Sequence, residues 1–175
     1  NVVAAIHEEA EIARAGRKGR IVIKMNALLE PETIEALYAA SQAGVEIEVI
    51  ARSVCALKPG VPGLSDNIRV RSVVGRFLEH HRIFYFHADG AEKLYLSSAD
   101  WMERNFFKRI EVAFPILDPK IKRRVMKEGL RPYLGDNCQA WELDADNHYR
   151  RKNPRTTRRS AQEILLKEFT GTSIG

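Results

Sequence analysis

The feature that most constrains the fold is a strand–helix–strand pattern over residues 21–50. The run Ile-Val-Ile at 21–23 is β-branched and predicts a buried strand. Pro31 suits the first turn of a helix that ends before Gly44. Residues 45–50 alternate and end in an apolar pair, which predicts a second strand. Such a unit of about 30 residues places its two strands parallel, joined by a right-handed crossover.

Other segments extend this unit into a larger α/β domain. Apolar residues recur at helical or alternating spacing, and Asp89-Gly90 between two apolar runs is typical of a hairpin turn. Ser160 followed by Glu163 is typical of a helix N-terminus. The additional expected elements are helices over 2–15, 119 to about 134 and 160–169, and strands over 68–73, 83–86, 94–96 and 110–116. We therefore expect an α/β fold in which a mixed sheet is flanked by helices in a single domain.

Composition narrows the class of protein. Of 175 residues, 45% are hydrophobic and 29% charged, which excludes a disordered or collagen-like chain. The net charge of +5 favours anionic partners. Cys55 and Cys138 alone make neither a four-cysteine zinc site nor a disulfide scaffold, so a reducing cytoplasm is expected. No apolar run approaches the roughly 20 residues of a membrane helix. Because the sequence begins with Asn1 rather than Met, we expect a piece of a longer polypeptide.

Polar side chains follow the ends of the two parallel strands. Arg52 lies just past the strand over 45–50, and Lys24 and Asn26 end the preceding strand. Ligands of open α/β sheets bind outside the carboxyl ends of the strands, and the planar fork of Arg can hold two phosphate oxygens. We take Arg52 as a candidate phosphate ligand, with Lys24 and Asn26 as supporting residues. The alternative for each is an ordinary solvated strand end.

His80 and Arg82 stand just before a very apolar strand. At this spacing both side chains can share one face of a strand, while His81 points to the other face. Imidazole titrates near neutral pH and Arg neutralises phosphate charge, so the pair suits phosphoryl chemistry. A purely structural role for His80 is the alternative.

A Ser-rich turn follows the second strand of the hairpin. Ser97, Ser98, Asp100 and Asn105 lie in this turn and are further supporting candidates. Small hydroxyl side chains at a strand end let donors approach an anion closely. The alternative is a plain strand-to-helix cap.

The C-terminal part is strongly basic. We divide the chain into residues 1–146, the main α/β domain, and residues 147–175, a basic segment with a short helix packed on that domain. Its cations are either a track for a polyanion or a flexible tail. They are Arg150, Arg151, Lys152, Arg155, Arg158 and Arg159.

Several motifs together resemble a known family through almost the whole chain. They are LYAASQAGV at 37–45, RSVC at 52–55, GLSDNIR at 63–69, FLEH at 77–80, SSADWM at 97–102, RN at 104–105 and RIEV at 109–112. These segments are similar to the C-terminal catalytic domain of bacterial polyphosphate kinases of the first type. The resemblance implies a phospholipase-D-like fold, in which two related α/β domains share one active site, and this chain matches the second of them.

The resemblance assigns roles to few residues. Arg52 and His80 match the family's ATP-contacting Arg and His, and His80 is thereby the expected catalytic histidine. The family's phosphohistidine nucleophile belongs to the first domain, whose motif no segment here matches. The magnesium-contacting arginines also lie upstream, so we expect no metal ligands in this chain. The phospholipase-type His-x-Lys motif stands here as His80-x-Arg82, as it does in the family.

The resemblance also implies a function. The chain is expected to be part of a kinase that reversibly transfers the γ-phosphate of ATP to inorganic polyphosphate through the upstream phosphohistidine, and to be inactive alone. ATP or ADP would be the substrate, with Mg²⁺ in the full enzyme. Expected partners are polyphosphate, upstream domains of the same polypeptide and further copies in a homo-oligomer, with no specific nucleic acid. The expected location is cytoplasmic, and peripheral membrane association is left open.

Two alternatives are kept. The first is half of a phospholipase-D-like phosphodiesterase or nuclease, which Arg82 in place of Lys disfavours. The second is a non-catalytic module that binds polyanions through the basic segment.

Overall fold

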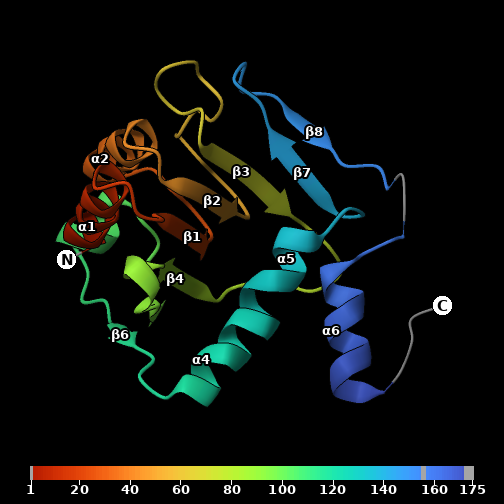
Figure 1. Cartoon of the computed structure of the whole chain (residues 1–175). Coiled ribbons are helices and arrows are strands. Elements are labelled where there is room, and N and C mark those ends of the chain that lie inside the picture. Colours follow the sequence, from red (N-terminus) through yellow and green to blue (C-terminus); the bar gives the residue numbers. More distant parts are fainter. Residues whose placement is uncertain (1, 155–156, 172–175) are drawn as a thin grey trace.

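Eight strands form one mixed sheet in the computed structural model, which describes residues 2–154 and 157–171 (Figure 1). The strands are β1 (Arg20–Met25), β2 (Glu46–Ala51), β3 (Ile68–Val73), β4 (Arg82–Phe86), β5 (Lys93–Ser97), β6 (Ala113–Pro115), β7 (Ala140–Leu143) and β8 (Tyr149–Arg151). Their order across the sheet is β6-β5-β4-β1-β2-β3-β7-β8. β1, β2 and β3 are parallel, and every other neighbouring pair is antiparallel.

The predicted strand–helix–strand unit is confirmed. Helix α2 (Pro31–Gln42) joins β1 to β2, and Ile21 lies beside Ile47 in the parallel register. Pro31 occupies the first turn, where its missing N–H costs nothing. The Glu30 carboxylate caps the helix by accepting from the N–H groups of Glu32 and Thr33. Buried apolar residues of β1 and β2 place this unit at the centre of the sheet.

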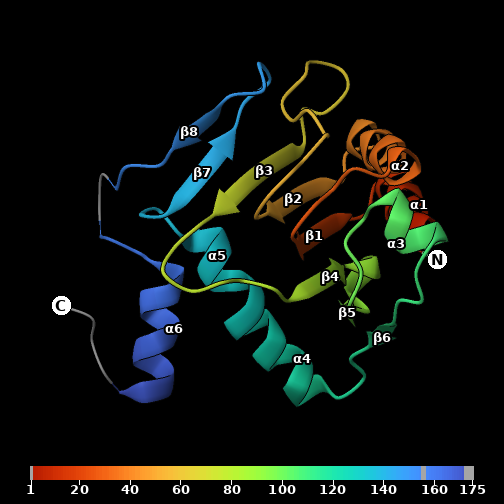
Figure 2. The same cartoon turned by 180° about the vertical axis from the view of Figure 1, so that it is seen from behind.

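Helices cover both faces of the sheet. One core cluster packs α1 (Val2–Arg14) and α2 against one face. The other packs α5 (Arg131–Gly135) and α6 (Ala161–Thr170) against the opposite face. Figures 1 and 2 show these two helix groups on either side of β1–β3. This is the expected mixed sheet flanked by helices. Shorter elements are η1 (Ala88–Gly90), α3 (Glu103–Phe107), α4 (Pro119–Val125) and the π-helical η2 (Met126–Leu130).

Several segments differ from the expected elements. The strand expected over 110–116 is limited to β6, because only Ala113–Pro115 pair with β5 and the preceding residues, among them the exposed Ile110 and Val112, lie outside the ladder. The helix expected from 119 to about 134 is divided into α4, η2 and α5 by the π-helical turn. Sequence patterns did not indicate the β7–β8 hairpin, and they indicated the helical turn of α3 only as the alternative interpretation of the Ser-rich turn. All three residues of β8 are exposed, so this strand carries no alternating pattern.

No helix among residues 2–154 and 157–171 combines the length and the apolar character that crossing a bilayer requires.

The first prediction concerns the central core. Leu37 of α2 is fully buried, and Leu117 is 80% exposed. We expect Leu37→Ala to lower the free energy of unfolding by about 2–5 kcal/mol, the range for buried Leu-to-Ala changes. Leu117→Ala, the matched control, should change it by less than about 0.5 kcal/mol. Urea denaturation followed by circular dichroism measures both. Equal effects would contradict this placement of α2.

Candidate functional site

One edge of the sheet gathers most of the candidate residues. Met25 pairs with Ala51, so Asn26 and Arg52 follow side by side at the carboxyl ends of β1 and β2. β4 is antiparallel to β1, which brings its first residue, Arg82, to the same edge. Three strands that are adjacent in the sheet therefore deliver polar side chains to one place.

Arg52 is held but not neutralised. Its Nε donates to Asn26 Oδ1 at 2.6 Å, and its carbonyl accepts from Ser72 Oγ at 3.0 Å. The side chain is half-buried, and no acidic side chain of residues 2–154 or 157–171 forms an ion pair with it. The terminal nitrogens of an oriented, unpaired guanidinium are well suited to an anionic ligand.

Asp100 is the buried centre of this edge. Its Oδ1 accepts from the N–H groups of Asn26 at 2.8 Å and Ala27 at 3.3 Å. Its two oxygens also accept from Arg82, Oδ1 from Nε at 3.1 Å and Oδ2 from Nη2 at 2.9 Å. Burial alone would raise the pKa of this carboxyl, but the bonds from Arg82 and the backbone outweigh it and hold the pKa below its usual value. Asp100 is therefore an ionised anchor for Arg82.

His80 lies at the outer end of this network. It precedes β4 instead of lying within the strand, so the expectation of two side chains on one strand face is corrected. Arg82 Nη1 nevertheless lies 3.2 Å from His80 Nδ1 and donates to the His80 carbonyl at 2.9 Å. A guanidinium can only donate, so Nδ1 accepts and the ring proton of neutral His80 belongs on Nε2. The side chain is exposed, which leaves Nε2 accessible.

A continuous set of contacts thus joins the two principal candidates. Arg52 binds Asn26, whose backbone binds Asp100, which binds Arg82, which contacts His80. The structure brings Arg52, Asn26, Arg82 and Asp100 to the edge that also carries His80. It does not add the remaining three supporting candidates or Lys24 to this network.

Ser98 and Asn105 bind a different carboxylate, and Ser97 bonds the backbone of the neighbouring residue. Ser98 Oγ and Asn105 Nδ2 both donate to Glu111, and these bonds lower the pKa of Glu111. Ser97 Oγ donates to the Val112 carbonyl at 3.2 Å. These side chains join the end of β5 to the segment before β6, so their donors are used within the protein.

A cavity of about 380 Å³ adjoins that second group. It lies under β4 and α3, its walls are largely apolar, and it contains neither Arg52 nor His80. Its lining includes Phe84, Ser97, Trp101 and Asn105. We place the candidate functional site where β1 and β2 end and β4 begins, because that part of the sheet carries the unpaired Arg52 guanidinium and the accessible His80 imidazole.

Lys24 is buried and turned away from the edge. Its Nζ donates to Glu79 Oε2 at 3.2 Å, lies 2.6 Å from His81 Nε2 and sits 2.9 Å from the centre of the Tyr133 ring. Burial lowers the pKa of Lys24 to about 7 against the attraction of Glu79. Burial and the Lys24 charge together lower the pKa of His81 to about 4. Sequence reasoning placed Lys24 beside Arg52 and missed its partners, which come from distant segments.

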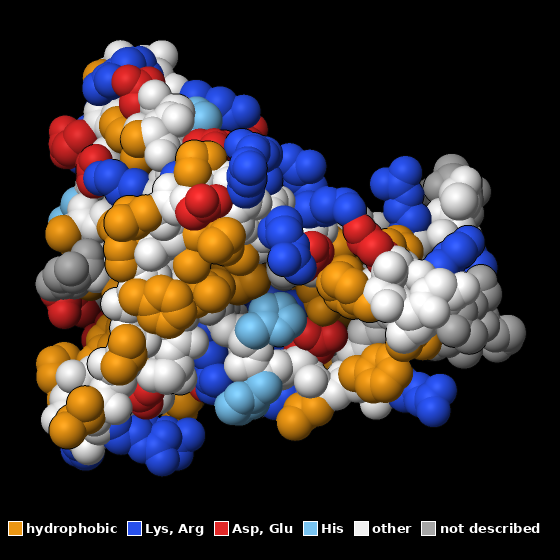
Figure 3. Space-filling view, turned by 90° about the horizontal axis from the view of Figure 1, so that it is seen from below, with side chains coloured by type: hydrophobic (Ala, Val, Ile, Leu, Met, Phe, Trp, Pro, Cys, Tyr) orange, Lys and Arg blue, Asp and Glu red, His pale blue; other side chains and the backbone are white. Residues whose placement is uncertain are grey.

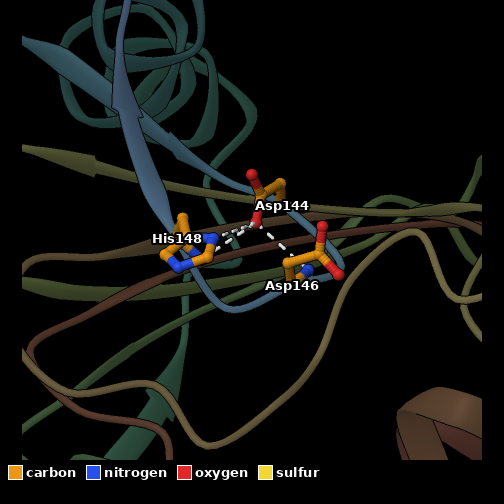
Figure 4. Close-up of side chains that lie close together, drawn as sticks. All are labelled: Asp144, Asp146 and His148. Carbon is orange, nitrogen blue, oxygen red and sulfur yellow. Dashed lines mark hydrogen bonds and ion pairs between the residues drawn. The ribbon is translucent and has the colours of Figure 1, made fainter.

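Figure 4 shows Asp144, Asp146 and His148 gathered in the turn between β7 and β8, a spacing at which a metal ion could be held. The Asp144 carboxylate already accepts the backbone N–H groups of Asp146 at 3.1 Å and His148 at 2.8 Å. It also pairs with Arg150 at 2.7 Å. These bonds explain why the three residues lie close together: the Asp144 carboxylate stabilises the turn between β7 and β8.

A second prediction follows from the burial of Lys24. Between about pH 7 and 10.5 the lysine is neutral in the folded state but protonated in the unfolded state. The unfolded state then binds more protons, so stability rises with pH, by up to about 1.4 kcal/mol per unit. Denaturant titrations from pH 7 to 10 should show this rise, and Lys24→Met should reduce it. The exposed Lys108→Met is the control, and parallel curves for all three proteins would contradict the placement of Lys24.

Comparisons with known proteins agree on one family. The family model of the polyphosphate kinase C-terminal domain 2 matches residues 1–162. The polyphosphate kinase of Burkholderia multivorans is 64% identical over 168 residues, which are 96% of this chain and 24% of that protein. That of Paraburkholderia phytofirmans is 63% identical with the same coverage. The chain therefore spans about a quarter of the length of these relatives.

Solved structures extend the comparison to the fold. The crystal structure of polyphosphate kinase from Porphyromonas gingivalis matches with a TM-score of 0.90 and 40% identity, over 96% of this chain and 26% of that one. Nuc, a phospholipase D family member from Salmonella typhimurium, matches with a TM-score of 0.52 and 14% identity, over 77% and 88% of the two chains. The second match shows the fold alone and confirms the expected phospholipase-D-like architecture. With its family model, its relatives and its fold in agreement, this chain belongs to the polyphosphate kinase family.

Proposed function

We propose that this chain supplies nucleotide-phosphate contacts to an ATP:polyphosphate phosphotransferase. The full enzyme would reversibly transfer the γ-phosphate of ATP to inorganic polyphosphate, through a phosphohistidine in an upstream domain of the same polypeptide. The observation that carries the proposal is the set of contacts from Arg52 to His80 at one edge of the sheet. Through these contacts, the unpaired Arg52 guanidinium and the accessible His80 imidazole would bind the same anionic ligand.

The geometry suggests a division of labour. The upstream histidine nitrogen would attack the γ-phosphorus, forming a P–N bond as the P–O bond to ADP breaks. The nitrogens of Arg52 would hold phosphate oxygens and offset charge in a loose, in-line transition state. His80 would bind the phosphates as well, and its Nε2 proton could be donated to the leaving oxygen of ADP. Arg82 would orient His80 through Nδ1, since its own charge is engaged by Asp100.

Magnesium is proposed to be held by residues outside this chain. The buried carboxylate at this edge, Asp100, has both oxygens bonded by Arg82, and Oδ1 by two backbone N–H groups as well. Such a carboxylate is a poor candidate for a hard divalent cation, which needs oxygen ligands with free lone pairs. The residues described here therefore do not fit a metal site at the Arg52–His80 edge.

Two surfaces support the proposed partners. Exposed apolar side chains recur between residues 107 and 121, and the view from below shows hydrophobic side chains spread over one half of that face (Figure 3). Large exposed apolar areas mark interaction surfaces, and we propose upstream domains or further copies of the enzyme as their partners.

The basic segment would guide polyphosphate, with Arg150 and Arg151 presented by β8. Arg155 lies outside the described residues. We propose a cytoplasmic location.

The third prediction tests the two principal residues. In a full-length polyphosphate kinase that contains this sequence, Arg52→Ala and His80→Ala should each lower kcat/KM for ATP about 100-fold, the usual cost of removing one charge-stabilising donor. Incorporation of labelled γ-phosphate into polyphosphate measures it. Arg69→Ala is the matched control, because Arg69 is the second residue of β3, at the opposite end of the parallel strands, and its side chain is 73% exposed.

Two outcomes would oppose the proposal. Unchanged kinetics in both variants would remove Arg52 and His80 from the phosphate site and favour a non-catalytic polyanion-binding module. Cleavage of a phosphodiester substrate offered beside ATP, with loss in the same variants, would favour the phosphodiesterase or nuclease alternative.

A further inference from the structure

His80 is carried by the connection between β3 and β4, which has no regular secondary structure. Two apolar side chains of this connection face solvent, Leu78 at 74% and Phe77 at 44% exposure. A solvent-facing segment of this kind has little packing of its own to fix a side chain. The position of His80 must therefore be fixed by contacts between the connection and other parts of the protein.

Glu79 ties the connection to three other elements. Its Oε2 accepts from Lys24 Nζ of β1 at 3.2 Å. Its Oε1 accepts from the Tyr133 hydroxyl of α5 at 2.8 Å and from Gln162 Nε2 of α6 at 3.1 Å. Burial would raise the pKa of Glu79, but Lys24 and these hydrogen bonds outweigh it and lower the pKa. The carboxylate therefore stays ionised and joined to all three partners.

Gln162 also holds the backbone of the connection directly. The Phe77 N–H donates to Gln162 Oε1 at 2.9 Å, and Gln162 Nε2 donates to the Phe77 carbonyl at 2.8 Å. The side chain of Gln162 is buried. A Cβ added to Gly75 would lie within 2.5 Å of both Gln139 Oε1 and Gln162 Oε1, so a side chain at this position would displace the ends of both glutamines.

His81 anchors the other side of His80. Its Nε2 lies 2.6 Å from Lys24 Nζ, and its ring packs edge-on against Tyr133. Residues 79 and 81 thus both contact the buried Lys24, Glu79 with a largely buried carboxylate and His81 with a ring that is 41% exposed. The residue between them stays exposed and meets Arg82.

We propose that Glu79 and Gln162 are positioning residues, which hold the connection so that His80 faces the phosphates bound by Arg52. In this arrangement α6 is a working part of the site, although it lies more than 80 positions along the chain from His80 and touches no phosphate. The proposal rests on the proposed function for its catalytic consequence, but its structural content can be tested separately.

The catalytic test is a double-mutant cycle in a full-length polyphosphate kinase that contains this sequence. A residue that acts through His80 has nothing to position once His80 is gone. Gln162→Ala removes three hydrogen bonds, and we expect it to lower kcat/KM for ATP about tenfold, the equivalent of about 1.4 kcal/mol. In the His80→Ala background it should lower kcat/KM less than twofold. Glu79→Gln should behave in the same way.

The structural test uses hydrogen exchange in the same proteins. Exchange of the amides of residues 75–82, followed by mass spectrometry, should become faster in Gln162→Ala and Glu79→Gln. Gln42→Ala is the matched control, since Gln42 is an exposed glutamine that donates to the Gly63 carbonyl at 2.9 Å. It should change neither exchange in this segment nor activity.

The failures of the two proposals are distinguishable. If His80→Ala alone leaves activity intact, the proposed function fails, and exchange still decides whether Gln162 holds the connection. If the losses from Gln162→Ala and His80→Ala multiply in full, Gln162 acts on overall stability and the positioning role is wrong. Unchanged exchange in residues 75–82 would also overturn it.

Discussion

The Asp100 carboxylate is the contact on which the site depends. It belongs to the turn after β5, yet it binds the backbone just past β1 and the guanidinium that begins β4. A buried carboxylate costs free energy unless its lone pairs are filled, and here the backbone and Arg82 fill them. The same bonds fix the relative positions of three chain segments. Arg52 and His80 are attached to this centre at its two ends, through Asn26 and Arg82.

A second buried charge lies behind the first and is neutralised by different means. Lys24 stands one strand position before Met25, and alternation along β1 sends its ammonium to the opposite face from the core that contains Met25. There it meets Glu79, His81 and the face of Tyr133. The polar side chains near the ends of these strands therefore form two clusters, one at the exposed edge and one around the buried Lys24, on the face that α5 and α6 cover. The connection that carries His80 takes part in both.

Local patterns predicted the central unit well and the periphery poorly. The β1–α2–β2 unit follows from a β-branched run, Pro31 and alternation, all of which act within a few residues of one another. Arg52 could be placed because the ends of parallel strands meet at one edge. The destination of Lys24 could not be predicted, since Glu79, His81 and Tyr133 are brought to it only by tertiary packing. Ser97, Ser98 and Asn105 look like anion donors in sequence, but Glu111 takes the bonds of the last two.

The two outermost strands of the sheet, β6 and β8, are protected against pairing with a strand of another molecule. β6 has three residues and ends in Pro115, and β8 has three exposed residues, two of which are Arg150 and Arg151. Proline and positive charge on short edge strands are the usual barriers to edge-to-edge aggregation. The arginines that would attract a polyanion therefore also oppose aggregation through pairing of β8 with an edge strand of another molecule. Replacing Arg150 and Arg151 by uncharged residues to study polyphosphate binding would therefore also lower solubility. Replacing them by lysine would keep the positive charge that opposes aggregation.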